Sequence, residues 1–216
     1  MRIPYVRHTL GNGLTVLVHE DRLVPLAAVS LWYHVGSKNE APGQTGLAHL
    51  FEHVMFEGSE HVSGGFFEPI QKAGGTLNGS TSADRTNYWE LMPSSGLELA
   101  LWMEADRMAS LRIDERTFVS EREVVKEERR MRIENPPYGL LNELITANAF
   151  DVHPYKHPVI GSMTDLNAAT IDDVREFYKT YYVPENATMM IVGDFEPDNA
   201  IALVNQYFGP VPKASQ

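Results

Sequence analysis

The feature that most constrains this chain is the segment GQTGLAHLFEHVMFEGSE. Its apolar residues recur with the period of a helix. His49 and His53 are four residues apart, so a helix of 3.6 residues per turn places them on one face, with Glu52 beside them. Burying two imidazoles and a carboxylate without partners is costly. The sequence therefore requires that this polar strip meets groups that offset the cost of burying it.

Length and composition describe an acidic chain without cysteine. Its 216 residues suffice for one large domain with a sizeable core. The formal charge of −11 argues against nucleic acid and against an anionic membrane surface as partners. The sequence has no apolar run of about 18 residues, so no transmembrane helix is predicted, and its first residues lack the apolar core of a signal peptide. The absence of cysteine excludes a thiolate ligand.

The rest of the chain predicts strands and helices without a regular βαβ order. Asn12-Gly13 between two apolar runs is a strong hairpin signal. The expected strands cover residues 9–10, 14–18, 26–35, 76–82, 86–91 and 188–192, and the expected helices cover residues 45–58, 66–73, 96–111, 115–134, 138–149, 171–181 and 197–208. This pattern favours an α+β fold in which a mainly antiparallel sheet packs against helices. It contains no internal repeat and no linker, so we expect a single domain over residues 1–216.

The histidine pair has the arrangement of a zinc hydrolase. Such a site needs two or three neutral or anionic ligands, an open coordination position and a base that takes a proton from water. His49 and His53 supply two ligands at a suitable separation, and Glu52 reaches the water rather than the metal. This is the H-x-x-E-H order, the reverse of the commoner H-E-x-x-H. The alternative is a core helix with two hydrogen-bonded histidines.

The spacing of residues leaves the third ligand open between histidine and carboxylate. One stripe of the expected helix 115–134 carries Thr117, Glu121, Val124, Glu128 and Met131. Two carboxylates thus interrupt a partly apolar face. A charged face exposed to solvent is the simpler interpretation on a helix this rich in Glu and Arg.

Two other groups compete for the role of third ligand. Glu104 shares a helix face with apolar residues, although a salt bridge to Arg107 would explain it without a metal. His153 and His157 form another pair four residues apart. A proline follows each of them, which argues against a regular helix and so against a second metal site.

Longer motifs resemble the pitrilysin, or M16, family of metallopeptidases. The resemblance rests on HLFEH, on the later SEREVVKEERR, and on NGLTVLVHED, GGTLNGSTSADRTNYW, LWMEADRM, HPYKHPVIGSMTDL and YYVPENATMMIVGDF. It implies that His49, His53 and Glu128 bind one Zn²⁺ per chain and that Glu52 is the general base. Glu121 then matches an acid that supports the site by orienting a ligand. The implied fold is the metallohydrolase domain of this family, and the implied reaction is cleavage of peptides or small unfolded polypeptides.

The resemblance also implies a substrate-binding strand, formed by Leu77, Asn78, Gly79, Ser80 and Thr81. Members of the family lay an extended peptide along this edge strand. Main-chain hydrogen bonds would then give affinity and side-chain pockets selectivity. The simpler interpretation is a sheet edge blunted by Gly and Ser.

Family members are usually built from two or four such domains that close around the peptide. The chain ends at YFGPVPKASQ, where the first domain ordinarily ends. We therefore expect the N-terminal, metal-binding half, with a second M16-type domain supplied by a C-terminal half or by a separate subunit. The isolated half is expected to bind zinc and to cleave weakly or not at all. The bacterial resemblance leaves the compartment open between cytoplasm and periplasm.

Two alternatives accompany this interpretation. S-ribosylhomocysteine lyase also carries an H-x-x-E-H pair, but its third ligand is a cysteine, which this chain lacks. A non-catalytic relative with a structural or partner-binding role, like the respiratory-chain core proteins, typically loses part of the motif. Here the motif is intact at His49, Glu52, His53 and Glu128.

Overall fold

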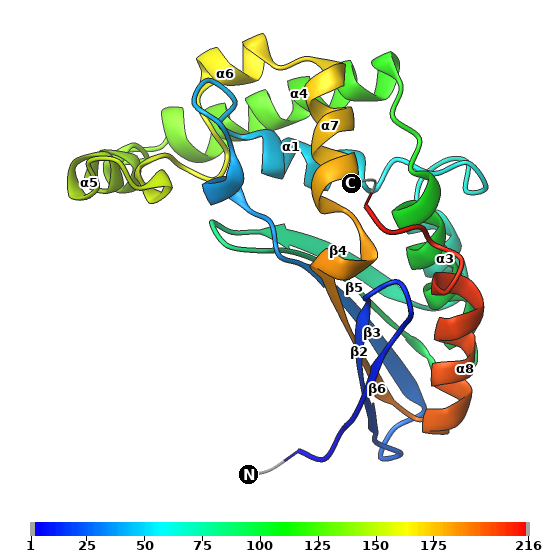
Figure 1. Cartoon of the computed structure of the whole chain (residues 1–216). Coiled ribbons are helices and arrows are strands. Elements are labelled where there is room, and N and C mark those ends of the chain that lie inside the picture. Colours follow the sequence, from blue (N-terminus) through cyan, green and yellow to red (C-terminus); the bar gives the residue numbers. More distant parts are fainter. Residues whose placement is uncertain (1–2, 215–216) are drawn as a thin grey trace.

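A six-stranded sheet forms the frame of the molecule (Figure 1), which is a computed structural model that describes residues 3–214. The strands lie in the order β1-β2-β6-β3-β5-β4. Only β2 and β6 pair in parallel, and the other neighbours are antiparallel. The expected α+β fold with a mainly antiparallel sheet is thereby confirmed. The strands are β1 (Val6–Thr9), β2 (Thr15–Glu20), β3 (Leu26–Tyr33), β4 (Thr76–Thr81), β5 (Thr86–Pro93) and β6 (Ala187–Gly193).

Two helices cover one face of the sheet. They are α3 (Leu97–Ser110), which packs on β3 and β5, and α8 (Pro197–Phe208), which packs on β2. Alternate strand residues such as Val29, Leu31 and Ile191 are buried on this side. This alternation follows from the two-residue period of a strand, because successive side chains point to opposite faces.

A second group of helices gathers beyond one end of the sheet (Figure 1). It comprises α1 (Leu47–Val54), α4 (Glu115–Arg129), α6 (Met163–Ala168) and α7 (Ile171–Tyr181). The ring of Phe51 on α1 lies 4.2 Å from that of Tyr182 and 5.8 Å from that of Phe177. This aromatic packing fixes the apolar side of α1 and leaves its polar strip facing α4 and β4.

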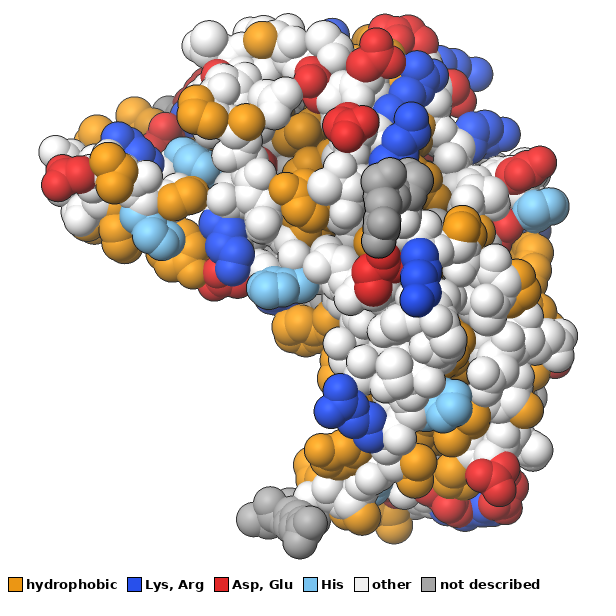
Figure 2. Space-filling view, in the orientation of Figure 1, with side chains coloured by type: hydrophobic (Ala, Val, Ile, Leu, Met, Phe, Trp, Pro, Cys, Tyr) orange, Lys and Arg blue, Asp and Glu red, His pale blue; other side chains and the backbone are white. Residues whose placement is uncertain are grey.

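A projecting segment, residues 135–158, carries α5 (Leu141–Ala149) and is called the α5 lobe below (Figure 1). Apolar side chains are exposed on it, among them Leu141, Leu144 and Ile145 (Figure 2). Arg129 ties the lobe to the body, since its guanidinium contacts Glu143 and the Gly161 carbonyl oxygen. Within residues 3–214, no helix has the length and apolar character needed to cross a membrane.

Short elements complete the chain. They are α2 (Phe67–Lys72), the 3-10 helices η1 (Ser37–Asn39), η2 (Ser94–Gly96), η4 (Pro154–Lys156) and η5 (Pro184–Asn186), and the π-helical turn η3 (Arg130–Glu134) that continues α4.

The predicted helices are all present, but several boundaries differ. The helix expected over residues 138–149 begins at Leu141, because Tyr138 adopts a left-handed φ of 62° that a helix does not contain. The helix expected over residues 115–134 is regular only to Arg129 and then widens into η3. The helix α6 was not predicted; Ser162 begins it, since its hydroxyl accepts the Asp165 N–H.

Candidate metal centre

The helix α1 is held at its start by a residue outside it. Gly46, at the N-terminal cap, has a φ of 92° and offers no side chain to the helix end. The carboxylate of Glu40 accepts hydrogen bonds from the N–H groups of Gly46 at 3.0 Å and Ala48 at 2.8 Å. Glu40 thus satisfies free donors at the helix start. No sequence pattern predicts this role, because Glu40 lies outside the helix and apart from any capping motif.

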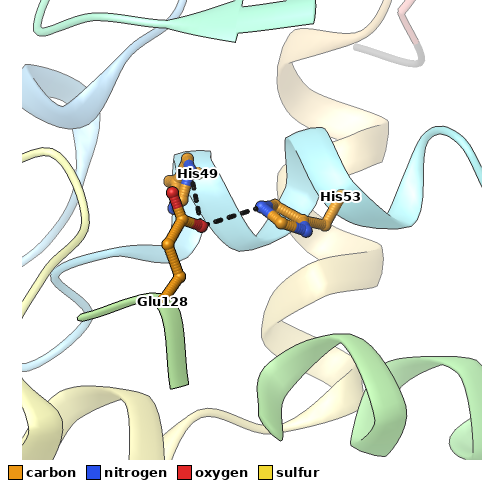
Figure 3. A group of neighbouring side chains, drawn as sticks. All are labelled: His49, His53 and Glu128. Carbon is orange, nitrogen blue, oxygen red and sulfur yellow. Dashed lines mark ion pairs between the residues drawn. The ribbon is translucent and has the colours of Figure 1, made fainter. Parts of the chain in front are cut away.

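The histidines of α1 and one glutamate of α4 converge (Figure 3). Glu128 Oε2 lies 3.4 Å from His53 Nε2 and 3.7 Å from His49 Nε2. Ligand atoms of these three residues all lie within 4.8 Å of one another, and no other group of three or more His, Cys, Asp or Glu in residues 3–214 comes together in this way. The structure therefore brings together the residues that the resemblance named as zinc ligands.

The spacing of these atoms fits a tetrahedral metal. Ligands about 2.0–2.1 Å from a shared zinc ion lie about 3.4 Å apart. The two measured separations, 3.4 and 3.7 Å, are close to this value and too long for good hydrogen bonds. The side chains are also largely enclosed, with exposed fractions of 14% for His49, 24% for His53 and 16% for Glu128. The donor set fits Zn²⁺.

The two histidines differ in their electrostatic surroundings. Burial, together with the neighbouring His53, lowers the pKa of His49 to about 4, so its imidazole is neutral at pH 7. Neutral imidazole is the form that binds a metal. Burial of His53 also disfavours its charged form, but the carboxylates of Glu121, Glu128 and Glu52 outweigh burial and raise its pKa. The site is thus dominated by negative charge that a cation would balance.

Glu121 lies on the far side of one imidazole. Its Oε2 is 3.4 Å from His53 Nδ1, while His53 Nε2 faces Glu128. The two nitrogens of His53 are therefore held between two carboxylates of α4. This is the geometry in which a carboxylate orients a metal-binding histidine.

Glu52 is turned toward the sheet rather than toward α4. It accepts a hydrogen bond from the hydroxyl of Thr81 on β4. Burial raises the pKa of Glu52, and the Thr81 hydrogen bond partly offsets this by stabilising the carboxylate. Thr81 was expected to contact a substrate; in the structure its side chain contacts Glu52.

A cleft of about 500 Å³ opens over these residues. Phe56, Phe67, Asn78, Gly79 and Arg132 also line it. The strand β4 forms its rim and is the edge strand of the sheet, pairing only with β5. The expected strand residues Leu77, Asn78, Gly79, Ser80 and Thr81 all belong to β4, but the Leu77 side chain is buried and does not reach the cleft.

The competing candidates lie elsewhere. Glu104 is 1% exposed and forms an ion pair with the buried Arg107, so it is not part of the cleft. His153 Nδ1 accepts the Tyr155 N–H, and His157 Nδ1 lies 3.7 Å from Glu40. These two histidines do not form a second cluster with other ligand types in residues 3–214.

Comparison with known proteins supplies independent information. The family model described as insulinase (peptidase family M16) matches residues 15–163, and the model of the M16 inactive domain matches residues 168–216. The chain is 38% identical to the zinc protease PqqE of Helicobacter pylori over 93% of the chain and 46% of that protein. It is 34% identical to an uncharacterized zinc protease of Mycobacterium leprae over 94% of the chain and 46% of the relative.

Solved structures agree in fold. A protease from Helicobacter pylori superposes with a TM-score of 0.95 at 34% identity, over 99% of this chain and 52% of that one. Pitrilysin superposes with a TM-score of 0.87 at 24% identity, over 99% of this chain and 23% of that one. The chain spans about half the length of the curated relatives named above.

Proposed function

The chain belongs to the M16 family of peptidases, and we propose that it is the zinc-binding half of a metalloendopeptidase. Its substrates are peptides or small unfolded polypeptides. The observation that supports this most is the convergence of His49, His53 and Glu128, with Glu52 beside them at the base of a cleft. The names of the relatives, which are zinc proteases, support the choice of metal.

The proposed ligand atoms are Nε2 of His49, Nε2 of His53 and Oε2 of Glu128, which hold one Zn²⁺ per chain. Bound zinc supplies the Lewis acidity that peptide hydrolysis at neutral pH requires. Glu121 keeps His53 in the orientation and tautomer that leave Nε2 free for the metal.

Glu52 is the proposed general base. Its carboxylate takes a proton from the attacking water and delivers it to the leaving amine. A pKa raised by burial suits this role, because proton transfer is most effective when the pKa of the base approaches the working pH. The hydroxyl of Thr81 holds the carboxylate against β4, at the side of the cleft where we expect the substrate.

The peptide is proposed to lie along β4 as an added strand. An edge strand has unpaired main-chain groups that an extended peptide can bind. Asn78 and Gly79 line the cleft, so these residues of β4 lie closest to the proposed scissile bond. The lack of a side chain at Gly79 lets the rings of Phe56 and Tyr88 pack closely on this part of β4, because a Cβ there would lie 3.1 Å from both rings.

A second M16-type domain is proposed to complete the active enzyme. The two relatives named above are about twice as long as this chain, and one similar solved structure is the first half of the periplasmic protease PqqL of Escherichia coli. The second domain is either the continuation of the same polypeptide or a separate subunit. We expect the isolated chain to bind zinc and to turn over peptides slowly, and the added second half to restore turnover.

Zinc content tests the ligand set. Elemental analysis of the purified chain should find about one zinc per molecule, with marked loss in Glu128→Gln. Glu104→Gln is the matched control, because Glu104 is also a mid-helix glutamate but contacts Arg107. Wild-type protein without zinc after loading at neutral pH would contradict the proposal. Zinc retained in Glu128→Gln and lost in Glu104→Gln would contradict the assignment of the third ligand.

Peptidase assays on the chain together with its second half test the base. Glu52→Gln should keep zinc and lose about 10²–10⁴-fold in turnover. A wild-type protein that binds zinc and shows no peptidase activity sensitive to Glu52→Gln would favour the alternative role as a structural or partner-binding subunit.

A further inference from the structure

Arg132 is the only lysine or arginine that lines the metal cleft in residues 3–214. It follows Glu128 by one helical turn, and its guanidinium forms an ion pair with Glu128 Oε1. The exposed fractions of the two side chains differ, at 74% for Arg132 and 16% for Glu128. An exposed arginine thus reaches back to a largely enclosed carboxylate.

The two oxygens of Glu128 consequently have different partners. Oε2 faces the imidazoles of His49 and His53, at 3.7 and 3.4 Å. Oε1 forms the ion pair with Arg132. A guanidinium is a strong, directional partner for a carboxylate oxygen, so it restricts rotation of the carboxylate plane.

We propose that Arg132 is a positioning residue that holds Glu128 as a ligand through one oxygen only. This inference rests on the proposed zinc function. Without Arg132, the Glu128 carboxylate is free to turn and to present both oxygens to the metal, which would fill the coordination position that the substrate and water need. Arg132 then orients the proposed ligand Glu128, just as Glu121 orients the proposed ligand His53.

The arginines next to Arg132 have other partners, which makes the contact specific. Arg129 is buried and contacts Glu143 in the α5 lobe. Arg130 pairs with Glu127 at 2.9 Å, outside the cleft. Arg132 itself lies in the π-helical turn η3, where the Asn135 N–H donates to the Arg130 carbonyl oxygen at 2.8 Å. Such wide turns occur frequently at functional sites.

Charge and orientation predict opposite results on removal of Arg132. A guanidinium near the cleft repels Zn²⁺, so an effect of charge alone predicts that Arg132→Gln tightens zinc binding. Orientation of Glu128 predicts weaker zinc binding, because a carboxylate that no partner holds must lose its rotational freedom when it binds the metal. Partners that orient a ligand typically change metal affinity by 10- to 100-fold. Because Arg132 is largely exposed, we expect a weakening near the lower limit, about tenfold.

The experiment measures the zinc dissociation constant of the chain by competition with a chelator, for wild type, Arg132→Gln, Arg132→Lys and Arg130→Gln. We expect about tenfold weaker binding in Arg132→Gln. Arg132→Lys should retain only part of the zinc affinity that Arg132→Gln loses, since an ammonium lacks the planar fork of a guanidinium. Arg130→Gln, which removes a helix ion pair outside the cleft, should match wild type.

A second measurement reports geometry directly. With Co²⁺ in place of zinc, the visible absorption depends on the number and arrangement of ligands. We expect Arg132→Gln to shift toward the weaker bands of higher coordination and Arg130→Gln to keep the wild-type spectrum. Equal or tighter zinc binding in Arg132→Gln with an unchanged cobalt spectrum would overturn the role of Arg132 alone. Absence of metal binding in wild type would overturn the zinc site as well.

Discussion

Two clusters of ionisable side chains in this protein both contain helical glutamates, but they differ in the partners of those glutamates. The metal cluster, His49, His53 and Glu128, borders a cleft. The arginine cluster, Glu90, Glu104 and Arg107, lies under β5 and α3 with at most 4% of each residue exposed. In the arginine cluster the carboxylates surround a fixed cation. In the metal cluster they face imidazoles, and the negative charge has no such buried partner.

The comparison shows that the role of a glutamate in the middle of a helix is indicated by the side chains that it contacts. Glu104 forms an ion pair with Arg107, whose guanidinium also lies 4.3 Å from the centre of the Tyr88 ring. The charge of Glu104 is thus balanced by a side chain of the protein, and no bound ion is required there. Glu128 offers one oxygen to two histidines and the other to an exposed arginine. A metal cation between these side chains would complete the arrangement, in keeping with the proposed zinc site.

The largest expected effect comes from removing the cation of the arginine cluster. Arg107→Met leaves Glu90 and Glu104 buried without a positive partner. Burial already raises the pKa of Glu90 well above its ordinary range. Breaking a buried ion pair from one side costs about 3–5 kcal/mol, and we expect this loss in urea unfolding at pH 7. Arg130→Met, an exposed control, should change stability by less than about 0.5 kcal/mol. A loss below about 1 kcal/mol in Arg107→Met would show that the cluster is not a structural ion pair.

A smaller effect, on zinc affinity rather than on folding, is expected at Glu121. Glu121→Gln removes the negative charge behind His53 Nδ1 and should weaken zinc binding by about 10- to 100-fold. The matched control is Glu123→Gln, because Glu123 lies on the same helix but pairs with Lys126 at 2.8 Å, away from the cleft. Equal zinc affinities of Glu121→Gln and Glu123→Gln would show that Glu121 does not support the proposed site through His53.

A pH-dependent effect on stability is expected at Glu40, a buried carboxylate whose partners are backbone N–H groups instead of a cation. Burial raises its pKa from 4.5 to about 8, and the hydrogen bonds from Ala48 and Gly46 oppose this rise. The folded state therefore binds a proton that the unfolded state releases, so stability falls as pH rises from 4.5 to about 8.

Unfolding free energies of the metal-free chain across this range measure that slope. Glu40→Gln, which does not ionise, should show a smaller decline than wild type between these pH values. An identical pH dependence of the two proteins would mean that Glu40 is charged in both the folded and the unfolded state.

Features that depend on residues close together in the chain could be predicted from the sequence. Helical spacing placed His49 and His53 on one face, the Asn12-Gly13 turn between apolar runs predicted the hairpin, and the order of the expected elements predicted a mainly antiparallel sheet. The third ligand came from the family resemblance, because spacing alone did not separate Glu128 from Glu104. That separation depends on which helix packs against α1, a contact between segments far apart in the chain.

Residues that contact the site from outside its motif could not be predicted from the sequence. Glu40 contacts the start of α1 from six residues before Gly46, through a loop. Arg132 occurs in an arginine-rich stretch in which nothing local distinguishes it from Arg130. The parallel pairing of β2 with β6 joins the two ends of the chain, so no short-range pattern reports it.

The distance along the chain between the two halves of the metal cluster has a consequence for folding kinetics. Between His53 and Glu128 lie 74 residues, and closing a loop of that length costs entropy before any contact forms. Of the proposed ligands, the unfolded chain holds only the local histidine pair close together, and the proposed third ligand, Glu128, joins them when α4 docks on α1. Zinc that binds the native arrangement stabilises it by mass action. We therefore expect zinc to slow unfolding and to leave the rate of folding almost unchanged.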